Sequence, residues 1–128
     1  MGKKRQIEHT NPDGTMVDVN VIGIDDPVIH DDVRIGRDVY IHTPCEIGCG
    51  IKIGDHTVIW SGVGIGEYTE IGDKVVIGND TYIGDYVTIE DNVTVLGDVQ
   101  IEDSVKICSG IIVHSGSIIG DSSVITAG

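Results

Sequence analysis

Histidine is the residue type in this sequence that is best suited to move a proton near neutral pH. An imidazole with a pKa of about 6.5 can accept the proton of a hydroxyl or amine while that group attacks a carbonyl carbon. The five histidines are His9, His30, His42, His56 and His114. No arrangement of the Ser-His-Asp or Cys-His type is visible. The candidate chemistry is therefore general acid–base catalysis by a histidine.

The composition restricts the partners that such a group could serve. The 128 residues include 18 Gly and no Phe, and 21 acidic against 8 basic side chains give a net charge of −13. This charge repels nucleic acid and anionic membranes. No apolar run approaches the ~20 residues that span a bilayer, and the N-terminus lacks the apolar region of a secretion signal. Three cysteines without a CxxC pair leave one unpaired in any disulfide framework, so we expect a cytoplasmic protein without nucleic-acid or membrane partners.

A six-residue repeat organises the chain and must position any catalytic group. Every sixth residue from Ile29 to Ile125 is Ile or Val, and a small or β-branched residue stands four places after each of the first sixteen. Gly or Glu follows the aliphatic residue in ten of the seventeen repeats, and Asp or Asn is common in the next two places. Gly, Asp and Asn tolerate the positive φ of a tight corner. The pattern predicts a short strand and a corner in each repeat, because an amphipathic helix would need a period of about 3.6 residues.

A weaker form of the repeat extends toward the N-terminus. Val17 and Gly23 also fall on the six-residue grid, with Thr15 and Val21 at the small position. We therefore expect a β-helix domain over residues 14–128, with an imperfect first coil over residues 14–26. Residues 1–13, which carry a basic cluster at positions 3–5, are expected to be a flexible N-terminal segment.

The repeats at residues 53–58 (IGDHTV) and 77–82 (IGNDTY) resemble those of the hexapeptide-repeat superfamily. In that pattern an aliphatic residue precedes Gly, Ala, Glu or Asp, two variable residues, a small residue and one more, and the match covers about residues 27–128. The resemblance implies an all-β fold, a left-handed parallel β-helix of the UDP-N-acetylglucosamine acyltransferase type. Such a fold is a triangular prism, here with about six coils of three hexapeptides. The left hand comes from the resemblance alone, because parallel crossovers are generally right-handed.

Three repeats per coil place residues 18 apart above one another, so the outward residues can be sorted by face. One face is charged, one is mixed, and the third carries a largely apolar column. That column is Tyr40, Val58, Val76, Thr94 and Ile112, and two positions further on the same face has His42, Trp60, Gly78, Leu96 and His114. We call these ten residues the stripe. Exposed apolar patches usually mark interfaces, so we expect the column, together with Trp60, to form a contact between subunits, with an unassembled monomer as the alternative. The resemblance implies a homotrimer, with ligands bound in the grooves between subunits.

The resemblance also implies acyl transfer, because most superfamily enzymes move an acyl group from acyl-CoA or acyl carrier protein to a sugar or amine. We expect acetyl-CoA as co-substrate, a sugar or nucleotide sugar as acceptor, and no bound cofactor or metal. His42 is the expected catalytic base and His114 the alternative, because the pantetheine arm of the donor runs toward the C-terminal end in this family. Gly78 and Leu96 would contact that arm, and Lys106 the phosphates of CoA. Repeats without an inserted loop indicate a second hypothesis, a non-catalytic assembly module.

Overall fold

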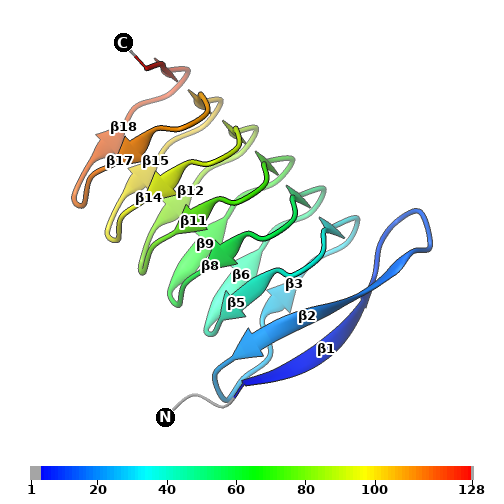
Figure 1. Cartoon of the computed structure of the whole chain (residues 1–128). Helices are drawn as coiled ribbons and strands as arrows, with labels where there is room; N and C mark the ends of the chain where they lie inside the picture. The colour runs from blue at the N-terminus through cyan, green and yellow to red at the C-terminus, as the bar shows by residue number, and fades with distance from the viewer. Residues whose placement is uncertain (1–3, 128) are drawn as a thin grey trace.

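The chain winds into an elongated triangular prism (Figure 1). The computed structural model describes residues 4–127, and in that range it contains strands and turns and no helix that could span a membrane. A hairpin of β1 (Lys4–Thr10) and β2 (Met16–Ile22) precedes the short strands β3 to β19. These are β3 (Val28–Ile29), β4 (Arg34–Ile35), β5 (Tyr40–His42), β6 (Cys45–Ile47), β7 (Lys52–Ile53), β8 (Val58–Ile59), β9 (Val63–Ile65), β10 (Glu70–Ile71), β11 (Val76–Ile77), β12 (Tyr82–Ile83), β13 (Thr88–Ile89), β14 (Thr94–Val95), β15 (Gln100–Ile101), β16 (Lys106–Ile107), β17 (Ile112–Val113), β18 (Ile118–Ile119) and β19 (Val124–Ile125). The predicted all-β, left-handed parallel β-helix is confirmed.

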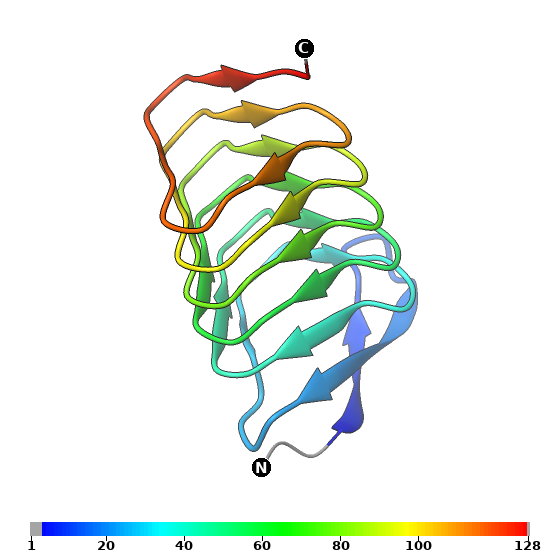
Figure 2. The same cartoon turned by 60° about the vertical axis from the view of Figure 1, so that its left-hand side comes forward.

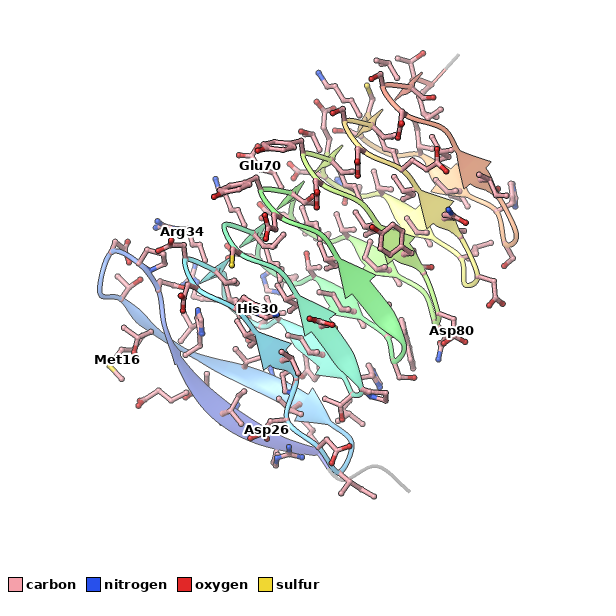
Figure 3. The ribbon with its side chains drawn as sticks, turned by 180° about the vertical axis from the view of Figure 1, so that it is seen from behind. Met16, Asp26, His30, Arg34, Glu70 and Asp80 are labelled. Carbon is pink, nitrogen blue, oxygen red and sulfur yellow. The ribbon has the colours of Figure 1, made fainter. Side chains whose placement is uncertain are left out.

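Three parallel sheets form the sides of the prism, and Figure 2 shows their coils rising from the N-terminal to the C-terminal end. Sheet 1 contains β2, β5, β8, β11, β14 and β17, with β1 antiparallel at its edge. Sheet 2 contains β3, β6, β9, β12, β15 and β18, and sheet 3 contains β4, β7, β10, β13, β16 and β19. Paired residues of the repeats lie 18 apart, as Tyr82 and Gly64 do, because three hexapeptides complete one coil. In Figure 3, Arg34 and Glu70 accordingly project from the same side of the prism, from strands two coils apart.

The core is a column of the aliphatic residues that the repeat places inside. Ile41, Ile59 and Ile77 are fully buried, and the largest fully buried side chains of the described residues are all Ile. A β-branched side chain suits a pleated strand. Each buried Ile contributes about 1.5–3 kcal/mol of transfer free energy. The core is continuous from coil to coil, so it needs neither a disulfide nor a metal to hold it together.

The corners differ from the sequence-based expectation in one respect. Positive φ occurs three residues after the aliphatic position, not at the Gly that directly follows it. The corner residue has a side chain in most coils, as in Asp38, His56, Tyr68 and Lys74. At these corners residues with a Cβ adopt the left-handed αL conformation, which is unfavourable for them. The packing around each corner must offset this cost in free energy.

The Gly after the aliphatic residue has a different function, which is to let adjacent coils approach closely. A Cβ added at Gly54 would lie 2.6 Å from the carbonyl carbon of Gly72, and one at Gly66 would lie 2.7 Å from that of Gly84. Real Cβ atoms do not approach backbone atoms this closely. Any larger residue at these positions would push the coils apart.

Asp residues two places after the aliphatic position connect the coils through hydrogen bonds. The carboxylate of Asp85 accepts a hydrogen bond of 2.8 Å from the backbone N–H of Glu67, in the preceding coil. Asp103 accepts one of 2.8 Å from Asp85, and Asp121 one of 2.9 Å from Asp103. A second ladder of the same kind runs through Asp55, Asp73 and Asp91. The frequent Asp of the repeat therefore satisfies backbone donors at the corners.

The N-terminal hairpin covers the first coil, and here the structure departs from the predicted register. Val21 is fully buried, as its place in the repeat predicts, but it pairs with Ile41, 20 residues away. Val19, which the repeat did not place inside, is also fully buried, whereas Val17 is only half-buried. The reason is that β2 follows the two-residue period of its partner β1.

The segment expected to be flexible has regular structure from Lys4 onward, while residues 1–3 lie outside the described residues. Asn11, at the end of β1, is buried and exchanges two hydrogen bonds with the backbone of Ile35. This contact satisfies a strand edge at the lower end of sheet 3.

Candidate functional site

The stripe lies on the outer surface of sheet 1, and its column has the register that the 18-residue spacing predicts. Tyr40 pairs with Val58, Val58 with Val76, Val76 with Thr94, and Thr94 with Ile112. The first four are half-buried, while Ile112 is 58% exposed. The column therefore presents a continuous band of mostly apolar side chains along five coils.

His42 and Trp60 form the centre of the candidate site. His42 is the last residue of β5 and Trp60 follows β8 directly, so both side chains leave adjacent coils on the same face. Their rings stack with centroids 3.9 Å apart and planes 15° from parallel. Trp60 is nevertheless 38% exposed. The indole thus holds the imidazole in one orientation and leaves an apolar surface beside it.

The environment of His42 favours its neutral form. Burial against Trp60 and the neighbouring backbone lowers the pKa of His42 from its usual value, because desolvation penalises the charged ring. No side-chain hydrogen bond to the His42 ring occurs within residues 4–127. A hollow of about 370 Å³ next to it is lined by Gly23, Asp25, Pro44 and Ser61, among others. A neutral imidazole has one unprotonated ring nitrogen. Beside a hollow, that nitrogen can accept a proton from a bound hydroxyl or amine.

The remaining predicted site residues are only partly brought together. Leu96 is on the stripe and 40% exposed. Gly78 lies between Trp60 and Leu96, but close packing against the next coil also requires Gly at this position. A Cβ there would lie 2.5 Å from the backbone nitrogen of Gly97. Lys106 projects from sheet 3, where its ammonium group lies 3.6 Å from the carboxylate of Glu90. Within one chain, Lys106 therefore does not share a face with Gly78 and Leu96.

His114 and His42 stand at opposite ends of the stripe. His114 is exposed and directly follows β17. In sheet 1, β17 is the fourth strand after β5, the strand that ends at His42. Four coils of about 4.8 Å each separate the two rings, so they cannot act on one substrate within a single chain. His114 has no stacked aromatic partner among residues 4–127, so its environment offers less to position the ring than that of His42.

The structure places one further histidine, His30, to which the sequence analysis assigned no role, in contact with a carboxylate. The Nε2 atom of His30 lies 3.0 Å from the Oε2 atom of Glu46, across adjacent coils of sheet 2. The two positions are 16 residues apart, so they fall in different 18-residue columns and the column sorting did not pair them. A search for diagonal neighbours between adjacent coils would have found them.

The cysteines and possible metal ligands define no second catalytic centre. Cys45, Cys49 and Cys108 are all free, and burial, with a smaller contribution from Glu46, raises the pKa of the Cys45 thiol to about 12. Such a thiol stays protonated and unreactive near neutral pH. Among the described residues, no group of three or more His, Cys, Asp or Glu side chains is placed to hold a metal ion.

The stacked pair gives a testable pH dependence. Because the folded state disfavours the His42 cation, the unfolded chain binds this proton more readily. The stability contribution of neutral His42 is therefore complete above a pH of about 6.5 and is lost as the pH falls through the lowered pKa of the folded protein. A stacked imidazolium quenches indole emission, and Trp60 is the only Trp. We expect fluorescence to fall on acidification with a midpoint below about 6.5, and His42→Gln to abolish this transition. A midpoint above the value for a free imidazole would contradict the burial argument.

Known proteins share the fold and part of the sequence. The model of the family described as the GMPPB C-terminal domain matches residues 17–118. No curated protein matches the chain. Among solved structures, a hexapeptide-repeat acetyltransferase from Vibrio cholerae is similar with 24% identity and a TM-score of 0.62, over 72% of this chain and 65% of that one. Serine acetyltransferase isoform 3 from Entamoeba histolytica, solved with cysteine, is similar with 24% identity and a TM-score of 0.52, over 78% of this chain and 34% of that one.

A hexapeptide transferase family protein from Anaplasma phagocytophilum is similar with 20% identity and a TM-score of 0.59, over 87% of this chain and 74% of that one. The chain thus spans slightly less than two thirds of the Vibrio protein and about one third of the Entamoeba enzyme. At these identities the likeness establishes a common β-helix fold. Function has to be argued from the site itself.

Proposed function

This chain belongs to the GMPPB C-terminal domain family and has the fold of the hexapeptide-repeat acyltransferases, and from that premise we propose that it transfers an acyl group. The donor in this proposal is acetyl-CoA, and the acceptor is the hydroxyl or amine of a sugar or nucleotide sugar. The observation that carries the proposal is the orientation of His42, whose ring is held by Trp60 and kept neutral by burial. A base in that state can accept a proton at physiological pH.

The proposed reaction needs one proton acceptor and no covalent enzyme intermediate. A ring nitrogen of His42 removes the proton of the acceptor as its oxygen or nitrogen attacks the thioester carbonyl carbon. The tetrahedral adduct then expels the thiolate of CoA by breaking the carbon–sulfur bond, and the imidazolium of His42 returns its proton to that sulfur. The products are the acylated acceptor and CoA–SH, and His42 is again neutral. Trp60 positions the imidazole through stacking and does not itself react.

The site in this proposal is completed by a second subunit. The column of Tyr40, Val58, Val76, Thr94 and Ile112 is a long, partly exposed band that another copy could cover, which supports a homotrimer. The pantetheine arm would run over Leu96 and Gly78. Lys106 projects from sheet 3, so it could meet the CoA phosphates only across a subunit boundary. The three free thiols support a cytoplasmic location.

A second candidate function is a non-catalytic assembly module that uses the same stripe. Two observations favour it: the coils from β3 to β19 run without an inserted loop, and the matching family is described as a C-terminal domain. In this case the stripe would hold copies of the chain together, and His42 would serve only as a packing partner of Trp60.

Release of CoA thiol from acetyl-CoA, measured with a panel of amino sugars and nucleotide sugars, separates the two candidates. Acyl transfer predicts saturable release with at least one acceptor and a fall in kcat of about 10²–10⁴-fold in His42→Gln. The matched control is His56→Gln, because His56 is an exposed corner residue paired loosely with Asp38 at 3.6 Å. A folded oligomer that releases no thiol with any acceptor, or a His42→Gln variant with unchanged kcat, would refute the catalytic proposal and leave the assembly module.

A further inference from the structure

A hollow of about 370 Å³ opens on the outer surface of sheet 2, away from the stripe. Its floor is formed by Gly48, Gly64 and Gly66, where no side chain covers the strands. His30 and Glu46 border it toward the N-terminal end, and Tyr82 borders it on the opposite side, one coil above Gly64. Figure 3 shows His30 on the first coils of the prism, near β3. The hollow thus has a bare floor, one aromatic wall and one polar wall.

Gly64 is the residue of this floor that the fold does not explain. Gly48 and Gly66 are needed for close packing, since a Cβ on either would lie 3.0 Å or less from backbone of the next coil. A Cβ on Gly64 would meet only Cδ1 of Tyr82, at 3.9 Å, which is an ordinary contact. Its φ is not positive either. Gly in a strand interior costs stability relative to a larger residue. The lack of a side chain at position 64 therefore serves to keep the hollow open.

The aromatic wall is a ring available for stacking. Tyr82 is 52% exposed and its ring leans over Gly64 rather than over another side chain. It is not one of the stacked aromatic pairs, which among the described residues are His42–Trp60 and Tyr68–Tyr86. The negative face of an aromatic ring attracts polarised C–H groups, such as those on the apolar face of a pyranose. A half-exposed ring above a bare floor suits a flat ligand of that kind.

The polar wall selects the charge of the ligand. One carboxylate oxygen of Glu46, Oε2, lies at hydrogen-bond distance from Nε2 of His30, 3.0 Å away. The second oxygen of Glu46 remains to accept a hydrogen bond from a ligand hydroxyl. The carboxylate of Glu67, which is exposed, stands at the same hollow. Two carboxylates repel phosphates and other anions in a chain of net charge −13. Hydroxyl donors and ammonium groups are the complementary partners.

We propose that this hollow is a binding site for a neutral or amino monosaccharide unit, which stacks on Tyr82 and donates hydrogen bonds to Glu46 and Glu67. Hydroxyl groups suit the carboxylate acceptors, and the ring C–H groups suit the tyrosine face. The bare floor at Gly64 provides the room. The site lies on sheet 2, whereas His42 and Trp60 lie on sheet 1, so it is independent of the acyl-transfer proposal and can be tested separately.

Titration with glucosamine and glucose, followed in ¹H–¹⁵N spectra of the full chain, tests this site. We expect saturable shifts at the backbone N–H groups of Gly48, Gly64 and Gly66, with a Kd on the order of millimolar for a single sugar ring. Glucosamine should bind more tightly than glucose because of its ammonium group. Glucose 6-phosphate should bind more weakly than glucose because of the two carboxylates.

Three variants distinguish a site from a general surface effect. Gly64→Val should fill the hollow and abolish the shifts without lowering Tm, since the strand tolerates a side chain there. Gly120→Val is the matched control, because a Cβ at Gly120 meets only an oxygen of Glu102 at 4.0 Å and lies outside the hollow. Tyr82→Ala should weaken binding by about tenfold and Tyr82→Phe should retain it. Shifts that do not saturate, or that persist unchanged in a folded Gly64→Val variant, would overturn the proposal.

Discussion

Gly66→Ala is expected to lower the free energy of unfolding by about 3 kcal/mol, although it adds a single methyl group. The new Cβ would lie 2.7 Å from both the carbonyl carbon and the carbonyl oxygen of Gly84 in the next coil. Backbone atoms cannot rotate away as a side chain can, so the coils must separate and the hydrogen bond from Gly66 N–H to Ile83 C=O, 2.7 Å long, must lengthen. In a chain of this length the change corresponds to a fall of roughly 10 °C in Tm, measured by circular dichroism.

Gly64→Ala is the matched control for this prediction, because it makes the same chemical change two residues earlier, within β9, the strand that Gly66 directly follows. Its Cβ would meet only the Tyr82 ring at 3.9 Å, so we expect a change within about 0.5 kcal/mol. Equal losses in the two variants would mean that strand propensity, rather than the spacing between coils, determines the cost. A neutral Gly66→Ala would show that the coils can separate freely.

Trp60→Glu is expected to convert an oligomer of this chain into monomers. In the proposed assembly Trp60 lies on the stripe, one coil above His42, where a carboxylate would be buried without a partner. Burying an unpaired charge at an interface costs about 2–5 kcal/mol, which is a loss of roughly 30- to 5000-fold in affinity for each contact. Light scattering after size-exclusion chromatography at micromolar concentration should give the mass of three chains for the native protein and of one chain for the variant.

Thr88→Glu provides the control for the assembly experiment. Thr88 is half-buried and faces outward on sheet 3, so the substitution adds the same charge to the surface on a different side of the prism. We expect its mass to equal that of the native protein. A native chain that is monomeric at micromolar concentration would refute the interface, and so would a Trp60→Glu variant that keeps its mass.

The sequence was sufficient to predict the fold and the vertical register of its faces. An aliphatic residue at every sixth position leaves little freedom in how the coils stack, because each inward Ile must pack against the inward residue 18 positions away. For this reason the column from Tyr40 to Ile112 and the proximity of His42 to Trp60 follow from counting alone. Stacking of the two rings, in contrast, depends on side-chain rotamers, which a repeat pattern does not encode.

Other features of the molecule were not predictable from the period. Val21 and Ile41 pair at a separation of 20 because a hairpin, with its own period of two, forms the first layer. The role of the repeated Gly was assigned to the corner, whereas it lies in the backbone contact between coils. His30 and Glu46 meet diagonally, so sorting into columns 18 residues apart does not pair them. In each case the deciding factor is geometry between coils, not composition within one hexapeptide.

The aspartate ladders repeat every 18 residues, through Asp55, Asp73 and Asp91 and through Asp85, Asp103 and Asp121, and this has an evolutionary consequence. Removal or duplication of one 18-residue unit, such as residues 73–90, would join points that are equivalent in all three sheets. Each such event would shorten or lengthen the prism by about 4.8 Å and leave the backbone donors of the two ladders with an aspartate acceptor. The fold therefore evolves in length by whole coils, and the distance between features on its faces, such as His42 and His114, can change only in these discrete steps.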